Sequence, residues 1–72
     1  MQNYYRLAVT KGEKEKYIDD TFSLMARHNV DPADSWMRIV ERPDGYFDMR
    51  LDLGCRAAHL KNSVLHMGWK LP

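Results

Sequence analysis

The stretch RPDGYFDMRLDL, residues 42–53, combines a turn signal with an alternating pattern. In Pro43-Asp44-Gly45, proline presets the first turn dihedral, aspartate bonds to nearby backbone, and glycine accepts the positive φ that closes a three-residue loop. Residues 35–42 and 46–53 are therefore expected to form an antiparallel hairpin. If the turn is type I with a glycine bulge, Arg42 pairs with Tyr46, and this pair sets the register of both strands.

Counting outward from this pair assigns every strand residue to one of two faces. The odd-numbered positions are mostly apolar, so they are expected to face the core. This apolar set is Met37, Ile39, Phe47, Met49, Leu51 and Leu53. The even-numbered positions point to the opposite face of the hairpin.

A short strand and a helix are expected before the hairpin. Residues 4–9 alternate with a period of two, which predicts a strand that buries Tyr5, Leu7 and Val9. Thr10 lies three residues before Glu13, the spacing of a capping box that starts a helix. Asn29 tolerates the left-handed conformation that ends one. The helix is expected to bury one side made of the stripe Ile18, Phe22 and Met25 and the flanking residues Tyr17, Thr21 and Leu24.

A second helix is expected after the hairpin, from about Cys55 to Met67, with Gly68 ending it. Its apolar stripe is Ala57, Leu60, Val64, Met67 and Leu71. The tail 69–72 is either frayed or a short fourth strand. The order β-α-β-β-α, with a short final β if the tail pairs, predicts a two-layer α+β fold with both helices on one face of a small antiparallel sheet. With a fourth strand it would resemble the ferredoxin-like folds, which host many unrelated functions.

The composition is that of one ordinary globular domain spanning residues 1–72. The 72 residues are 44% hydrophobic and 29% charged, and the formal net charge is +1. A charge so close to zero gives no long-range attraction to nucleic acid or anionic membranes. The single cysteine, Cys55, excludes an internal disulfide and fits a reducing compartment. No stretch has the pattern of a leader or a membrane span, so we expect a cytoplasmic protein without membrane contact.

The sheet face turned away from the helices is expected to be rich in arginine and aromatic side chains. It carries four of the six arginines and three of the eight aromatic residues. The candidate binding residues on it are Tyr4, Arg6, Trp36, Arg38, Arg42, Tyr46 and Arg50. Arginine and aromatic residues are enriched where proteins bind each other, because they offer large contact areas and paired hydrogen bonds to carboxylates.

Two other interpretations of this face remain open. It could be an ordinary solvated sheet face, in which arginine and aspartate pair across strands. However, the register puts Arg38 directly opposite Arg50, and like charges in that position are destabilising unless Asp48, Asp52 or an anionic partner relieves them. The face could also stack single-stranded nucleic acid. Against this, the segment 44–48 shares only a glycine and the first aromatic residue with the pattern of the RNA-recognition motif.

Sequence signals for catalysis and metal binding are weak. Cys55 and His59 are four residues apart on the expected helix, but two ligands do not make a zinc site, and His28 would be needed as a further donor. Asp19 and Asp20 are adjacent and diverge on a helix. No phosphate loop or nucleophile motif occurs. We therefore expect neither an enzyme nor a cofactor.

The combined expectation is a small binding module that acts stoichiometrically on a protein partner through the arginine and aromatic face. Single-stranded nucleic acid is the alternative ligand. Small domains of this size are common among phage and mobile-element proteins that inhibit or regulate a host protein, which is an association from size alone. The exposed sheet edges also allow a homodimer.

Overall fold

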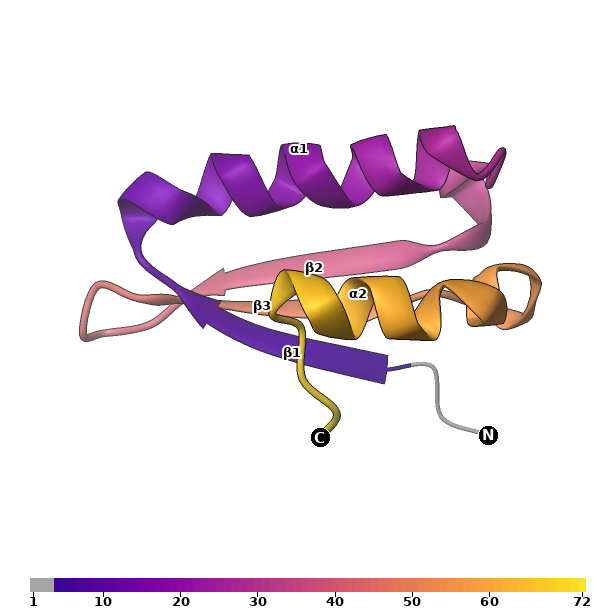
Figure 1. Ribbon diagram of the computed structural model, residues 1–72. Coiled ribbons are helices and arrows are strands. Elements are labelled where there is room, and N and C mark those ends of the chain that lie inside the picture. The colour runs from indigo at the N-terminus through magenta and orange to yellow at the C-terminus, as the bar shows by residue number, and fades with distance from the viewer. Residues whose placement is uncertain (1–3) are drawn as a thin grey trace.

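The computed structural model describes residues 4–72 as an open antiparallel sheet with helices on one side (Figure 1). This bears out a small α+β fold. The elements in chain order are strand β1 (Tyr4–Val9), helix α1 (Lys11–Arg27), a 3₁₀ turn (Pro32–Asp34), strands β2 (Trp36–Glu41) and β3 (Phe47–Asp52), a 3₁₀ segment (Cys55–Leu60) and helix α2 (Lys61–Met67).

The hairpin has the turn and the register that its sequence predicts. The Arg42 N–H donates to the Tyr46 carbonyl at 2.7 Å, and the Gly45 N–H donates to the Arg42 carbonyl at 3.1 Å. Gly45 has a φ of +91°, the left-handed conformation that this turn requires. Counting from the turn, Ile39 lies opposite Met49. The strand order is β1-β3-β2, so β3 is central and pairs antiparallel with both neighbours.

The core lies between the sheet and the helices. Its buried hydrophobic members are Tyr5, Val9, Leu24, Met25, Val30, Met49, Leu51, Leu53, Ala57, Leu60, Val64 and Trp69. Trp69 is only 1% exposed, and its indole N–H donates to the Thr21 hydroxyl at 3.1 Å. That hydroxyl in turn donates to the Tyr17 carbonyl at 2.7 Å. The tail thus closes one side of the core, and the buried polar groups of Trp69 and Thr21 both have hydrogen-bond partners.

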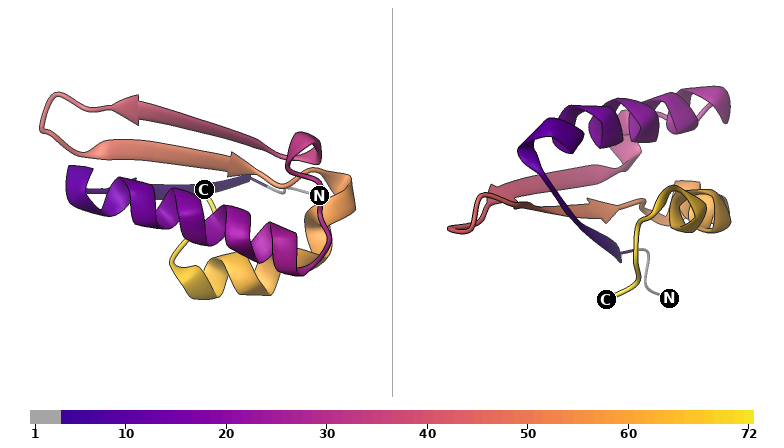
Figure 2. Two further views of the ribbon diagram at one scale, coloured as in Figure 1. Left: turned by 90° about the horizontal axis from the view of Figure 1, so that it is seen from above. Right: turned by 60° about the vertical axis from the view of Figure 1, so that its left-hand side comes forward.

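The helices do not cover the sheet evenly, and this corrects two expectations from the sequence. Seen from above, α1 overlies β1, and β2 lies on the side of the sheet away from α2 (Figure 2, left). As a result, Ile39 remains 37% exposed and Met37 is only partly buried. On α1, Phe22 is 40% exposed. Thr21 and Leu24, which flank the predicted stripe, are buried together with Met25, so the buried face of α1 is centred to one side of the stripe.

The beginning of α1 has the predicted capping residues. The Thr10 N–H and the Thr10 hydroxyl both donate to Oε1 of Glu13, at 3.1 and 2.9 Å. These bonds hold the pKa of Glu13 below its ordinary value. At the other end, Asn29 has a φ of +57°, as expected for a residue that follows a helix.

The C-terminal third differs from the continuous helix that its sequence predicts. Cys55–Leu60 is 3₁₀, and only Lys61–Met67 is α-helical. Of the predicted stripe, Met67 is partly buried and Leu71 is exposed, because the chain has left the helix at Gly68. The tail does not form a strand, but Lys70 makes one antiparallel bridge to Arg6. Neither helix in the described part of the chain has the length and apolar character needed to cross a bilayer.

Candidate binding face

The sheet face turned away from the helices, here called the open face, consists of three short rows across the strands. The pairing registers place Tyr4, Asp52 and Trp36 in the first row, Arg6, Arg50 and Arg38 in the second, and Ala8, Asp48 and Val40 in the third. Residues directly opposite each other in a sheet point to the same face, so each row is a line of neighbouring side chains. All three arginines of the second row are exposed.

Lys70 extends the second row to four cationic residues. Lys70 and Arg6 exchange two backbone hydrogen bonds, of 2.7 and 2.9 Å, across the outer edge of β1. Because Arg6 uses its backbone groups on that side, Arg6 and Arg50 form the closer, non-hydrogen-bonded type of pair, with Cα atoms about 4.5 Å apart. The order Lys70, Arg6, Arg50, Arg38, here called the cation row, therefore spans about 15 Å.

The aspartates on the open face do not neutralise the cation row. Asp48 contacts Arg42 instead, at 3.6 Å, and Asp52 accepts a hydrogen bond from the Gly54 N–H at 2.9 Å. Among residues 4–72, no carboxylate oxygen lies within 4.0 Å of the guanidinium nitrogens of the row. Directly opposed like charges weaken a sheet by roughly 0.2–1 kcal/mol per pair. The fold therefore retains an unfavourable charge arrangement on this face.

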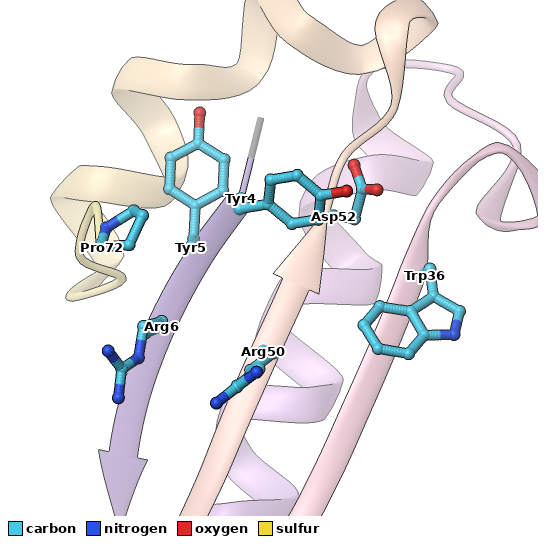
Figure 3. A pocket seen from close by; sticks show the side chains of 7 residues that line it. All are labelled: Tyr4, Tyr5, Arg6, Trp36, Arg50, Asp52 and Pro72. Atoms are coloured by element: carbon cyan, nitrogen blue, oxygen red, sulfur yellow. The ribbon is translucent and has the colours of Figure 1, made fainter. Parts of the chain in front are cut away.

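An open pocket of about 640 Å³ lies between the first row and the middle of the cation row (Figure 3). Its lining residues are Tyr4, Tyr5, Arg6, Trp36, Arg50, Asp52 and Pro72. In Figure 3, Tyr4 extends from β1 over β3 toward Asp52, and Trp36 lies on the other side, on β2. Tyr4 and Trp36 are about half exposed, at 53% and 50%. The pocket thus joins two aromatic walls to two guanidinium groups.

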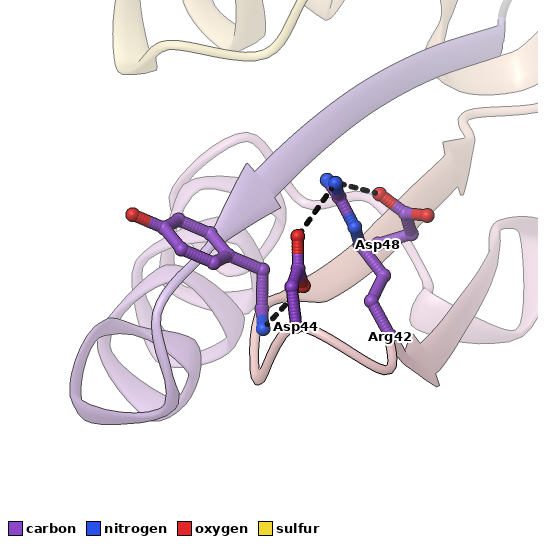
Figure 4. Close-up of polar contacts among 4 residues, drawn as sticks. Arg42, Asp44 and Asp48 are labelled. Atoms are coloured by element: carbon purple, nitrogen blue, oxygen red, sulfur yellow. Dashed lines mark hydrogen bonds and ion pairs between the residues drawn. The ribbon is translucent and has the colours of Figure 1, made fainter.

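Arg42 lies at the hairpin end, apart from the cation row, beside Asp44 and Asp48 (Figure 4). The Arg42 guanidinium contacts Asp44 at 2.8 Å and Asp48 at 3.6 Å. It also lies 5.9 Å from the centre of the Tyr46 ring. Arg42 is therefore already paired with carboxylates, whereas the arginines of the cation row have no carboxylate partner among residues 4–72.

The structure thus divides the seven predicted binding residues into two groups. Tyr4, Arg6, Trp36 and Arg50 meet at the pocket, with Arg38 next to Arg50 in the row, while Arg42 and Tyr46 are at the turn. Sequence reasoning missed Lys70 and the contribution of Pro72. A single bridge leaves no periodic pattern in the sequence. The only signal was that residues 69–72 could form a short fourth strand instead of fraying.

The weak metal signal does not assemble into a site in the described residues. No group of three histidine, cysteine, aspartate or glutamate side chains converges within residues 4–72. His28 and His59 do meet, edge to face, with ring centres 6.3 Å apart. Cys55 is exposed.

Comparison with known proteins identifies no relative of this chain, so its function is inferred from the open face. No protein-family model, no curated protein and no solved structure matches this chain.

Proposed function

We propose that the protein is a small non-enzymatic binding module whose open face binds an acidic segment of another protein, one copy to one target. The observation that supports this is the cation row, because it places unpaired guanidinium groups next to one another on an exposed surface. Carboxylates of a partner would relieve this repulsion on binding. Guanidinium groups suit this role because they form two parallel hydrogen bonds with a carboxylate.

The aromatic pocket suggests what flanks the carboxylates in the partner. Tyr4 and Trp36 offer apolar surface on either side of the pocket, beside Arg6 and Arg50. Large aromatic residues and arginine are the side chains that most often dominate binding energy at protein interfaces. We therefore infer a target segment with acidic residues next to a bulky apolar residue that enters the pocket.

The positions of the aspartates favour protein over nucleic acid. Asp52 lies between Tyr4 and Trp36 in the first row, and Asp48 lies in the third row. The cationic strip is therefore one residue wide and bordered by carboxylates on both sides. A nucleic-acid strand that stacked bases on Tyr4 and Trp36 would bring phosphates close to Asp52, which is unfavourable, and the net charge of +1 adds little attraction.

A titration with two polyanions of equal length tests this proposal. Trp36 fluorescence is followed while oligo-glutamate carrying one leucine, or oligo-deoxythymidine, is added. We expect saturable binding of the peptide, at least tenfold weaker in Arg38→Gln/Arg50→Gln and unchanged in the matched control Arg27→Gln/Arg56→Gln, which removes two exposed arginines outside the sheet. Tighter binding of the oligonucleotide would favour the nucleic-acid alternative. An equal loss of peptide affinity in the control would show that the effect depends only on the net charge of the protein.

A pull-down adds a second test on the protein itself. Trp36→Ala/Arg38→Ala should lose a partner that the wild-type protein captures, while its thermal melt stays nearly unchanged because both side chains are exposed. Loss of folding would instead mean that these residues hold the domain together.

Other parts of the proposal depend on context outside the chain. We propose a cytoplasmic protein, in keeping with its single cysteine. A role as a phage or mobile-element inhibitor or regulator, a ferredoxin-like arrangement or a truncated version of it, and self-association through a sheet edge remain predictions.

A further inference from the structure

The outer edge of β2 carries backbone groups without partners in the described chain. In an antiparallel pair, hydrogen-bonded positions alternate along the strand. Because Arg42 bonds to Tyr46 of the hairpin, the even-numbered residues of β2 turn their N–H and C=O groups toward β3. Met37, Ile39 and Glu41 therefore turn theirs outward. No strand among residues 4–72 lies beyond β2, whereas the outer edge of β1 is bonded to Lys70 at Arg6.

Apolar side chains accompany this edge on both sides of the sheet. Ile39 is 37% exposed on the helix-facing side, and Val40 is 44% exposed on the open face. Sheet proteins usually protect an edge strand with proline, a bulge or inward-pointing charges. Trp36–Glu41 contains no proline and pairs with β3 without a bulge, and its one charge on the helix-facing side, Glu41, is exposed at the end of the strand. This edge therefore has the features of a surface that pairs with another strand. The sequence alone predicted only that the sheet edges are exposed.

A second copy of the chain can pair with this edge in very few registers. The two edge strands would be related by a two-fold axis perpendicular to the sheet. Residues directly opposite each other must share a face, so one residue lies opposite its own copy and the axis passes between these two. An axis at residue 38 sets Arg38 opposite Arg38 of the second copy. An axis at residue 40 sets Arg38 opposite Arg42. An axis at residue 39 opposes no like charges.

We propose that the protein forms a homodimer in which the two β2 strands pair antiparallel with Ile39 opposite Ile39. In this register Met37 lies opposite Glu41, so the outward backbone groups of both copies exchange about six hydrogen bonds. Arg38 lies opposite Val40. The three-stranded sheets join into one six-stranded sheet, which covers the exposed Ile39 and Val40 of each copy. This inference does not depend on the proposed function.

The geometry of the dimer makes the two open faces continuous. The two-fold axis is perpendicular to the sheet, so both open faces point in the same direction. Each cation row ends at Arg38 near the joined edge. A dimeric target or a long acidic segment could then contact both rows at once, which raises apparent affinity without new contacts. Residual repulsion between the rows makes the dimer tighter at high salt.

Disulfide trapping tests the register directly. In a Cys55→Ser background, cysteine is introduced separately at positions 38, 39 and 40. Only Ile39→Cys should form a covalent dimer rapidly under mild oxidation, because its two Cα atoms would be about 5.5 Å apart, within the range of a disulfide. The symmetry-related residues at 38, and those at 40, would be about 8 Å apart, too far for a disulfide without backbone movement. Faster trapping at 38 or 40, or equal rates at all three, would overturn the register.

Sedimentation equilibrium tests the dimer itself. Wild-type protein should show a concentration-dependent dimer, and Ile39→Glu should weaken it at least tenfold because two carboxylates would meet at the axis. The matched control is Leu71→Glu, which changes an exposed apolar residue of the tail by the same charge and should leave the dimer unchanged. A wild-type protein that stays monomeric at all soluble concentrations would refute the proposal. Binding of oligo-glutamate by a monomeric protein would still support the proposed function, so the two failures are distinguishable.

Discussion

At the scale of single residues, the core contains one polar atom whose hydrogen-bonding capacity is unused. Tyr5 is fully buried, and its hydroxyl has no partner among residues 4–72. Burial also raises the pKa of Tyr5 above its ordinary value. An unsatisfied buried hydroxyl costs about 1–3 kcal/mol of stability. Tyr4 is the contrasting neighbour, since its side chain is exposed on the open face.

Replacing Tyr5 with phenylalanine should therefore stabilise the domain. We expect Tyr5→Phe to raise the free energy of unfolding by about 1 kcal/mol, measured by urea denaturation with an unchanged m-value. Tyr4→Phe should have almost no effect. A raised folded-state pKa means that stability is lost as pH rises above about 10, and Tyr5→Phe should remove part of that loss. A less stable Tyr5→Phe protein would show that the hydroxyl is hydrogen-bonded in solution.

Gly45 and Gly54 both have a positive φ, but only Gly54 is closely packed. Substitutions at the two positions therefore separate the cost of backbone strain from the cost of a steric collision. Gly45 has a φ of +91° and nothing within 4 Å of the position a Cβ would occupy. Gly54 has a φ of +74°, and a Cβ there would collide with the carbonyl oxygen of Asp34. The backbones before β2 and after β3 thus approach each other closely at Gly54.

The two alanine substitutions should differ clearly in cost. Gly45→Ala should lose about 1 kcal/mol from backbone strain alone. Gly54→Ala should lose about 3 kcal/mol or more, because a backbone collision adds to the strain. Thermal melts of both variants against the wild-type protein measure the difference. Equal costs would mean that the loop at Asp34 shifts freely.

At the scale of secondary-structure elements, α1 depends on the ionised form of its capping residue. The backbone and hydroxyl of Thr10 hold the pKa of Glu13 below its ordinary value of 4.5. A lowered folded-state pKa means that the stabilisation is fully present above about pH 4.5 and is lost as pH falls through the folded-state value.

The helix should therefore weaken in acid in a way that Glu13→Gln removes. We expect the stability of the wild-type protein, followed by helical circular dichroism, to fall on acidification with a component that is absent in Glu13→Gln. Glu15→Gln is the control, since it makes the same charge change on the same helix. An identical acid profile for all three proteins would show that the cap does not contribute.

The same scale shows how far the sequence predicts the structure. The hairpin register and the cap of α1 follow from local chemistry, because Gly45, Thr10 and Glu13 interact only with close neighbours in the chain. The exposure of Ile39 and Phe22 could not be predicted in this way. It depends on how far the helices are displaced across the sheet, which is decided by packing between distant segments. The position of Lys70 opposite Arg6 is a non-local contact of the same kind.

At the scale of the whole molecule, the charge is balanced in total but not in distribution. A formal net charge of +1 conceals a line of four cationic residues on one face. Arg50 of the central strand has an arginine opposite it on each side, Arg6 on β1 and Arg38 on β2. This placement suggests that stability and binding make opposite demands on the same residue.

Arg50→Gln should therefore stabilise the free protein while it weakens binding. Removing two like-charge contacts should add about 0.5–1 kcal/mol to the free energy of unfolding at low salt. The gain should shrink at about 1 M salt, where screening weakens the repulsion in the wild-type protein. Arg56→Gln should show neither effect. If Arg50→Gln is destabilising at low salt, the row is not repulsive.

The two tryptophans occupy opposite environments, one sealed beside Thr21 and the other at the rim of the pocket. The molecule consequently contains two optical reporters that need no label. Acrylamide should quench Trp36 readily and Trp69 scarcely until the domain unfolds. A ligand that shields the first indole without altering the second would thus be seen to dock on the intact fold.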